Sequence, residues 1–164
     1  NYSLTTAYLA GLVDGEGYIG IKKTVVRKDC AAPTYHARIQ VRMVAEEAIA
    51  FLADQCGGRY YREKVPTLPS RRPLFCYQAS NASAEDVLRR LLPHLRVKRI
   101  NAEAVLRFRD WQATGRAHRT KVLGYREFQG FRGGIRRVRT MGFSDEYLAN
   151  CEAFYRECKR LNGH

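Results

Sequence analysis

Two carboxylates, Asp14 and Glu16, stand at the end of an apolar stretch that reads LAGLVDGEG, from Leu9 to Gly17. The leucines three apart favour a helix, and the YIGIKKTVV that follows is typical of a strand. A helix C-terminus carries partial negative charge, so acids are unfavourable there unless something positive is bound. In a chain of net charge +13, the position of this pair therefore raises the question of what positive group lies beside it.

The overall charge indicates a polyanionic partner. Lys and Arg number 29 against 16 Asp and Glu, and a basic surplus of this size favours nucleic acid. A ribosome-associated or simply soluble basic protein is the alternative. The 164 residues suit one domain, or one subunit with an extension, and no apolar run is long enough to span a membrane.

The cysteines and histidines form no recognisable framework. The five cysteines are an odd number without a C-x-x-C pair, and the four histidines are scattered, so no zinc site is predicted. We expect reduced thiols in an intracellular protein of the cytoplasm, nucleoid or an organelle, and not a secreted one.

Hydrophobic periodicity predicts a fixed order of elements. They are a helix over 4–13, strands over 18–28 and 35–44, a helix over 45–55, a hairpin of 59–65 with 74–80, and helices over 83–92 and 100–113. Ser83 is the expected N-cap of the helix that Pro93 ends, and Ser144 begins a last helix, expected to serve packing only. The order predicts an α+β fold, αββαββα, with a four-stranded antiparallel sheet, helices on one face, and the C-terminal helix in addition.

The uncovered face of this sheet is basic. The predicted DNA contacts from its first two strands are Lys22, Thr24, Lys28, Arg38, Gln40 and Arg42, and the hairpin adds Arg62 and Lys64. Arg, Lys and Gln can read base edges in a major groove, so this face is a candidate DNA surface. An ordinary solvated face is the alternative, which the lack of balancing acids disfavours.

The segment after the last core helix differs in kind. Residues 116–139 hold eight Lys and Arg and one acid, and several glycines argue against regular structure over much of the segment. Its cations, with Arg136, Arg137 and Arg139 among them, are expected to contact phosphates. We divide the chain into a core over 1–113 and, packed on the same domain, a basic loop segment with the C-terminal helix over 114–164.

The stretch LAGLVDGEG resembles the signature of the LAGLIDADG homing endonucleases, DNases encoded by introns and inteins. It matches at Leu9, Ala10, Gly11, Leu12, Asp14 and Gly17, with Val13 for Ile, Gly15 for Ala and Glu16 for Asp. The predicted order of elements is similar to the family core, so the resemblance covers residues 4–113. It implies an intron-encoded type of nuclease that cuts both strands of a specific DNA site.

A chain with one motif implies a homodimer, because the family's longer members carry two motifs. The implied interface consists of Ala10, Gly11, Asp14 and Gly15, where two motif helices would lie side by side. For the small residues, a helix contact within one chain is the alternative. A dimer implies a long, near-palindromic target.

The resemblance assigns the chemistry to Glu16 and Lys98. In the family, the acid at the position of Glu16 binds a divalent metal, and its hard oxygens suit Mg²⁺; a turn-capping acid is the alternative. The catalytic lysine of the single-motif branch falls on Lys98, although Arg96 or Arg99 could substitute, and a phosphate contact is the alternative role. Asp14 is expected to satisfy backbone donors first.

One family feature has no counterpart in this chain. Relatives often place a water-holding glutamine at the end of the second strand, where this chain has Met43 or Val44. Gln40 lies too early and is expected to read bases, whereas Arg42 or Glu46 could take over the water. Two other functions stay open: an RNA maturase acting on intron RNA, and a DNA-binding module without cleavage, which Glu16 disfavours.

Overall fold

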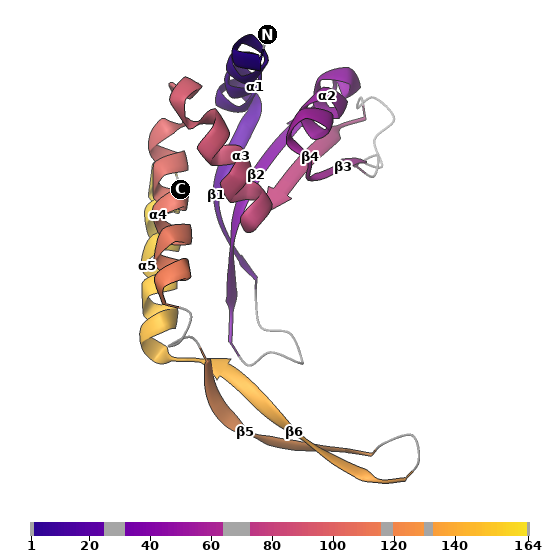
Figure 1. Ribbon diagram of the computed structural model, residues 1–164, viewed down its shortest axis with the longest axis vertical. Coiled ribbons are helices and arrows are strands. Elements are labelled where there is room, and N and C mark those ends of the chain that lie inside the picture. The colour runs from indigo at the N-terminus through magenta and orange to yellow at the C-terminus, as the bar shows by residue number, and fades with distance from the viewer. Residues whose placement is uncertain (1, 25–31, 64–72, 116–119, 130–132, 164) are drawn as a thin grey trace.

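The computed structural model describes residues 2–24, 32–63, 73–115, 120–129 and 133–163. Its elements are α1 (Tyr2–Glu16), β1 (Gly17–Thr24), β2 (Thr34–Met43), α2 (Glu46–Cys56), β3 (Arg59–Arg62), β4 (Phe75–Ser80), α3 (Ala82–Leu91), the 3-10 turn η1 (Leu92–His94), α4 (Arg99–Thr114), β5 (Thr120–Gln129), β6 (Ile135–Phe143) and α5 (Asp145–Leu161). The first four strands form an antiparallel sheet in the order β1-β2-β4-β3, and β5 pairs with β6 alone (Figure 1). The predicted α+β class and αββαββα order are confirmed.

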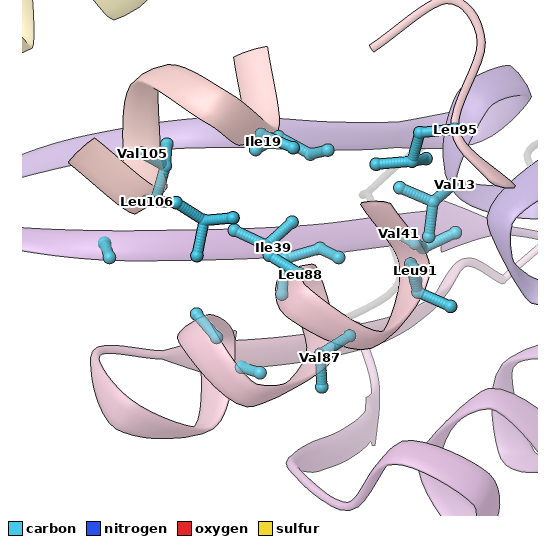
Figure 2. Packing of buried hydrophobic residues seen from close by; sticks show 14 of the residues in the cluster. Val13, Ile19, Ile39, Val41, Val87, Leu88, Leu91, Leu95, Val105 and Leu106 are labelled. Atoms are coloured by element: carbon cyan, nitrogen blue, oxygen red, sulfur yellow. The ribbon is translucent and has the colours of Figure 1, made fainter. Parts of the chain in front are cut away.

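The core lies between the sheet and its helices. Tyr35, Ala37, Ile39 and Val41 of β2 are buried, and the polar residues between them are not. Figure 2 shows Val13, Val87, Leu88, Leu91, Leu95, Val105 and Leu106 from the helical layer packing toward Ile19, Ile39 and Val41 of the sheet. A slip of one residue in β2 would exchange its buried and polar sets, so this burial fixes which side chains face away from the helices.

The two predicted N-caps have different outcomes. Ser144 caps α5 as expected, because its Oγ accepts the Tyr147 N–H at 3.2 Å. The expectation for Ser83 was wrong, since α3 begins one residue earlier and Asn81 precedes it. Asn81 has a φ of 52° and its amide lies 3.2 Å from the His36 Nδ1. Asparagine adopts a positive φ more readily than most residues, which lets the chain turn directly from β4 into α3.

Residues 120–129 and 135–143 form two paired strands, so the expectation of little regular structure over much of this segment was wrong. β5 and β6 pair from Thr120–Phe143 to Gln129–Ile135, with an irregularity between Val122 and Gly124. The register skips Leu123, the neighbouring Gly124 has a φ of 154°, and Gly133, with a φ of 76°, lies beyond the end of the ladder. The glycines therefore stand at irregular points that a hairpin requires.

Two further expectations concern cysteines and membranes. Among the described residues, no disulfide joins Cys56, Cys76, Cys151 or Cys158 to one another, and Cys30 lies outside these residues. Across the same described ranges, no helix combines the length and apolar character needed to cross a bilayer.

Candidate functional site

Asp14 is held by the loop that precedes α4. Its carboxylate accepts the backbone N–H of Arg96 at 2.6 Å and that of Lys98 at 2.8 Å. Partial burial raises the pKa of Asp14, but these amides and that of Val97 outweigh burial, so the pKa lies below its ordinary value. Asp14 is therefore an ionised anchor between the end of α1 and the start of α4, in agreement with its expected role toward backbone donors.

Lys98 approaches the same end of α1 with its side chain. Its Nζ donates to the backbone carbonyl of Asp14. Carbonyls in the last turn of a helix lack partners within the helix and carry partial negative charge, which an ammonium group stabilises. The structure therefore places Lys98 beside the turn that ends at Glu16.

Glu16 is the uncommitted carboxylate of the pair. It is exposed, and no hydrogen bond or ion pair joins it to another residue that the structure describes. Within the described part of the chain, no three His, Cys, Asp or Glu side chains gather as a metal-binding group. An exposed carboxylate can hold a cation together with oxygen ligands from another molecule.

The uncovered sheet face begins next to Glu16. A cleft of about 490 Å³ extends from Glu16 over this face, where it is lined by Lys22, Arg38, Gln40 and Arg42. Helix α5 forms its other wall with Tyr155, Lys159 and Asn162. Thr24 lies farther along β1, where it pairs with Thr34. The structure therefore brings five of the predicted site residues to one cleft.

The polar groups of this face differ in how far they are engaged. Arg42 donates its Nε to Glu63 at 2.7 Å, and Gln40 donates to the Cys76 Sγ at 3.1 Å. The Nε of Arg38 is buried and has no acceptor among the described residues. A buried donor without a partner costs about 1–3 kcal/mol, so Arg38 gains most from an acceptor that a ligand supplies.

Ala10 does not lie where the interface prediction requires. It is completely buried within the chain's own core, whereas the exposed side of α1 carries Leu4, Tyr8, Gly11 and Gly15. A Cβ added at either glycine would meet no atom within 4 Å. Ala10 and Gly11 are adjacent in a helix and therefore point about 100° apart, so both cannot face the same second helix.

Some predicted DNA contacts lie off the uncovered sheet face, and others lie outside the residues that the structure describes. Arg62 pairs with Phe75, a residue of the buried side, so it faces the helical layer and not the cleft. Lys28 and Lys64 lie outside the described residues, and Arg136, Arg137 and Arg139 are described only by their backbone in β6.

The structure adds residues of β3 and β4 to the uncovered face. Gln40 pairs with Gln78, which pairs in turn with Arg59, and Arg38 pairs with Ser80. Alternation in FCYQAS, with Phe75, Tyr77 and Ala79 buried, could have identified Gln78 and Ser80 from the sequence.

Helix α5 packs on the sheet as expected, and polar contacts add to its apolar side. Glu152 accepts from the Lys23 Nζ at 2.7 Å and from the Tyr35 Oη at 2.6 Å, and Asn162 donates to the Ile19 carbonyl at 3.0 Å. The hydrogen bond from Lys23, followed by that from Tyr35, lowers the pKa of Glu152 to about 2. These contacts hold α5 against edge strand β1, where it forms one wall of the cleft.

Known sequences and known structures give different results. No protein-family model and no curated protein sequence matches the chain. The homing endonuclease I-CvuI, in complex with the I-CreI target, matches with a TM-score of 0.65 and 16% identity over 98% of this chain and 83% of its own. The LAGLIDADG meganuclease I-AabMI bound to uncleaved DNA matches with a TM-score of 0.62 and 14% identity over 92% and 45%.

A third structure, the archaeal intron-encoded homing endonuclease I-Vdi141I complexed with DNA, has a TM-score of 0.56 and 13% identity, over 70% of this chain and 72% of its own. These likenesses agree with the motif that begins at Leu9 and with the order of elements that follows it. The chain therefore has the fold of the LAGLIDADG homing endonucleases.

Proposed function

We propose that this chain is an intracellular, homodimeric, Mg²⁺-dependent endonuclease that cuts both strands of a long, near-palindromic DNA site. The observation that carries the proposal is the cleft that joins the uncommitted carboxylate of Glu16 to Arg38, Gln40 and other polar residues of the sheet. Fold neighbours that are bound to DNA support the same class of substrate.

The exposed side of α1 supports the homodimer. Leu4 is 66% exposed and Tyr8 is 53% exposed, in line with the uncrowded Gly11 and Gly15. Two glycines and two apolar side chains on one helical stripe suit close approach of a second helix. This chain spans less than half of I-AabMI.

The residues present fit a divalent cation. Glu16 offers the hard oxygen that Mg²⁺ prefers, and phosphate, water and the Glu16 of a second copy would complete the ligands. A bound Mg²⁺ would supply an activated water and stabilise the leaving 3′ oxygen. Lys98 would stabilise negative charge near the attacked phosphate, while Asp14 fixes the backbone that carries Lys98.

Of Arg42 and Glu46, Arg42 is the better candidate to hold the water that a glutamine holds in relatives. It lines the cleft together with Glu16, at the last uncovered position of β2. Glu46, the other candidate, accepts from the Tyr60 hydroxyl, and Tyr60 stacks on Phe75 of the buried side. Arg42 would act by orienting water or phosphate oxygen in its protonated form.

The test is a selection of cleaved sites from a randomised DNA library, with Mg²⁺ and with EDTA. We expect one related set of near-palindromic sites, recovered only with Mg²⁺. Specific binding without cleavage would identify a DNA-binding module, and stimulated splicing of an intron RNA without DNA cleavage would identify a maturase; each result would overturn the proposal.

A further inference from the structure

The β5–β6 hairpin is an arm outside the four-stranded sheet. It forms a sheet of its own and projects from the ends of α4 and α5, at the end of the molecule opposite α1 (Figure 1). Its strands have ten and nine residues, so each spans about 30 Å at 3.4 Å per residue. A two-stranded hairpin alone is marginally stable in water, which indicates that this arm has a partner.

The arm has cationic positions on both of its faces. Its strands contain Lys121, Arg126, Arg136, Arg137 and Arg139 against the single acid Glu127. The pairs Tyr125–Arg139 and Glu127–Arg137 share one face, and Arg126–Val138 and Phe128–Arg136 share the other. A ribbon that docks on a protein core needs one apolar face, whereas arginine positions on both faces suit a groove walled by phosphates.

The base of the arm is fixed at the outer end of the sheet, between its strands and helices α4 and α5. Phe143 stacks on Tyr147 at 5.1 Å between ring centres, and Tyr147 stacks on Trp111 at 5.2 Å. Phe143 also lines a pocket of about 260 Å³ with Thr34 and His36, which begin β2. Because β2 begins at the end of the sheet farthest from Glu16, the arm leaves from the outer end of the sheet.

Resting on the proposed function, we propose that the hairpin is a β-ribbon that lies in a groove of the DNA flanking the site, beyond the part that the sheet covers. With Glu16 near the dimer axis, each copy places its arm on an outer flank. The major groove admits a two-stranded ribbon, and its phosphate walls would receive the arginines. A second copy of this chain is a poorer partner for a basic arm, because each copy carries +13.

The arm would thus lengthen the bound site through contacts that do not depend on base sequence. Its test compares the selected site, trimmed to the footprint of the sheet, with the same site extended by one helical turn, about 10 base pairs, on each side. The arm variant is Arg136→Gln/Arg137→Gln/Arg139→Gln. The control, Arg89→Gln/Arg107→Gln/Arg156→Gln, removes three arginines that form ion pairs on the helices.

Binding across a salt series, with hydroxyl-radical footprints, separates the outcomes. The wild type and the control should bind the extended duplex more tightly and protect its flanks. The arm variant should lose both effects, with a log–log salt slope shallower by about 2.7 for three lost phosphate contacts. If the triple variant is unfolded, Arg126→Gln alone should lower the slope by about 0.9.

If the wild type binds the trimmed and the extended duplex equally, the inference about the arm is wrong, and the proposed function is unaffected. If the selection yields no site, random-sequence duplexes of the two lengths still test the arm while the proposed function fails. Tighter binding to an RNA duplex, or a change in sedimentation of the arm variant without DNA, would assign the arm to RNA or to a second copy, and would overturn the inference.

Discussion

The two ends of the molecule hold their charged groups in different ways. At the end of α1, two backbone amides fix the Asp14 carboxylate, and Lys98 donates to a helix carbonyl. At the other end, the hairpin is held by the pairing of its own strands and by its aromatic base (Figure 1). Chemistry at one phosphate needs groups placed within about 1 Å, whereas attraction to a row of phosphates tolerates movement. The firmly held groups of the α1 end therefore suit catalysis, and the hairpin suits electrostatic binding of phosphates.

The sharpest way to break this comparison is Glu16→Gln, which removes a charge at the α1 end and keeps its shape. Even indirect partners of a metal are worth about 10–100-fold, so loss of a direct ligand should lower cleavage by more than about 100-fold. Binding of the uncleaved site should persist, because the sheet makes those contacts. Nicking and gel-shift assays on one target measure both quantities, and near-normal cleavage would remove Glu16 from the metal site.

Gly11→Leu tests whether the α1 end is completed by a second copy. Because a Cβ at Gly11 meets nothing within 4 Å, the monomer should fold as well as before, and leucine also favours a helix more than glycine does. A close contact with another α1 would instead be overpacked, at a cost of about 1–3 kcal/mol in dimer stability.

Sedimentation equilibrium with thermal unfolding separates these two effects of Gly11→Leu. Gly115→Leu is the matched control, because it lies at the end of α4 and its Cβ would make only an ordinary contact at 3.5 Å. An unchanged dimer in Gly11→Leu would place the interface elsewhere, and a monomeric wild type that makes double-strand breaks would exclude the need for a dimer.

The sheet between the two ends should read bases, and Arg38→Ala tests this. Loss of a guanidinium that contacts a base edge should cost about 1–3 kcal/mol at the selected site and relax preference at one base pair of each half-site. Arg62→Ala is the control, since Arg62 faces the helical layer. Binding to a panel of single-base variants gives the result, and equal losses on every sequence would reduce Arg38 to a phosphate contact.

Local pattern made much of this architecture predictable. In β2, buried and polar residues alternate without a break, so the positions of Arg38 and Gln40 follow from the sequence. The family resemblance assigned Glu16, in the motif, and Lys98, in a separate stretch, to one site; in the structure both lie at the end of α1, while their roles stay predictions.

The remaining features depend on contacts that no local pattern encodes. Ala10 and Gly11 are both small, and only packing against the core determines that one is buried and the other open. The Lys23–Glu152 pair joins residues 129 positions apart, so the docking of α5 on β1 was not predictable. In the hairpin, the number of glycines in the sequence indicated a loop. Where each glycine stands relative to the strand pairing could not be read from the sequence.

Asp14→Asn tests whether Asp14 and Glu16, both at the end of α1, have different roles. Asparagine keeps one acceptor oxygen but turns an NH₂ toward a backbone N–H, so one hydrogen bond is lost at a cost of about 1 kcal/mol in unfolding free energy. Cleavage should fall as well, because the backbone that carries Lys98 is loosened. Glu16→Gln should instead leave the melting temperature unchanged, and equal destabilisation by both variants would show that Glu16 also has a structural role.

The smallest expected effect concerns Glu152, which ties α5 to the sheet between the two ends. Its pKa falls from an ordinary 4.5 to about 2, chiefly through Lys23. Because the folded pKa is the lower one, the stabilisation is complete above pH 4.5 and is lost as the pH falls toward 2. Solvent reaches both partners, whose side chains are 34% and 25% exposed, so the effect should be smaller than that of Asp14→Asn.

Thermal unfolding of Glu152→Gln and wild type should show a small difference near neutral pH that disappears in acid, with Arg156→Gln, a 77% exposed partner, as the control. A difference that stays constant into acid would mean that Glu152 acts through its shape and its hydrogen bond to Tyr35, and not through its charge.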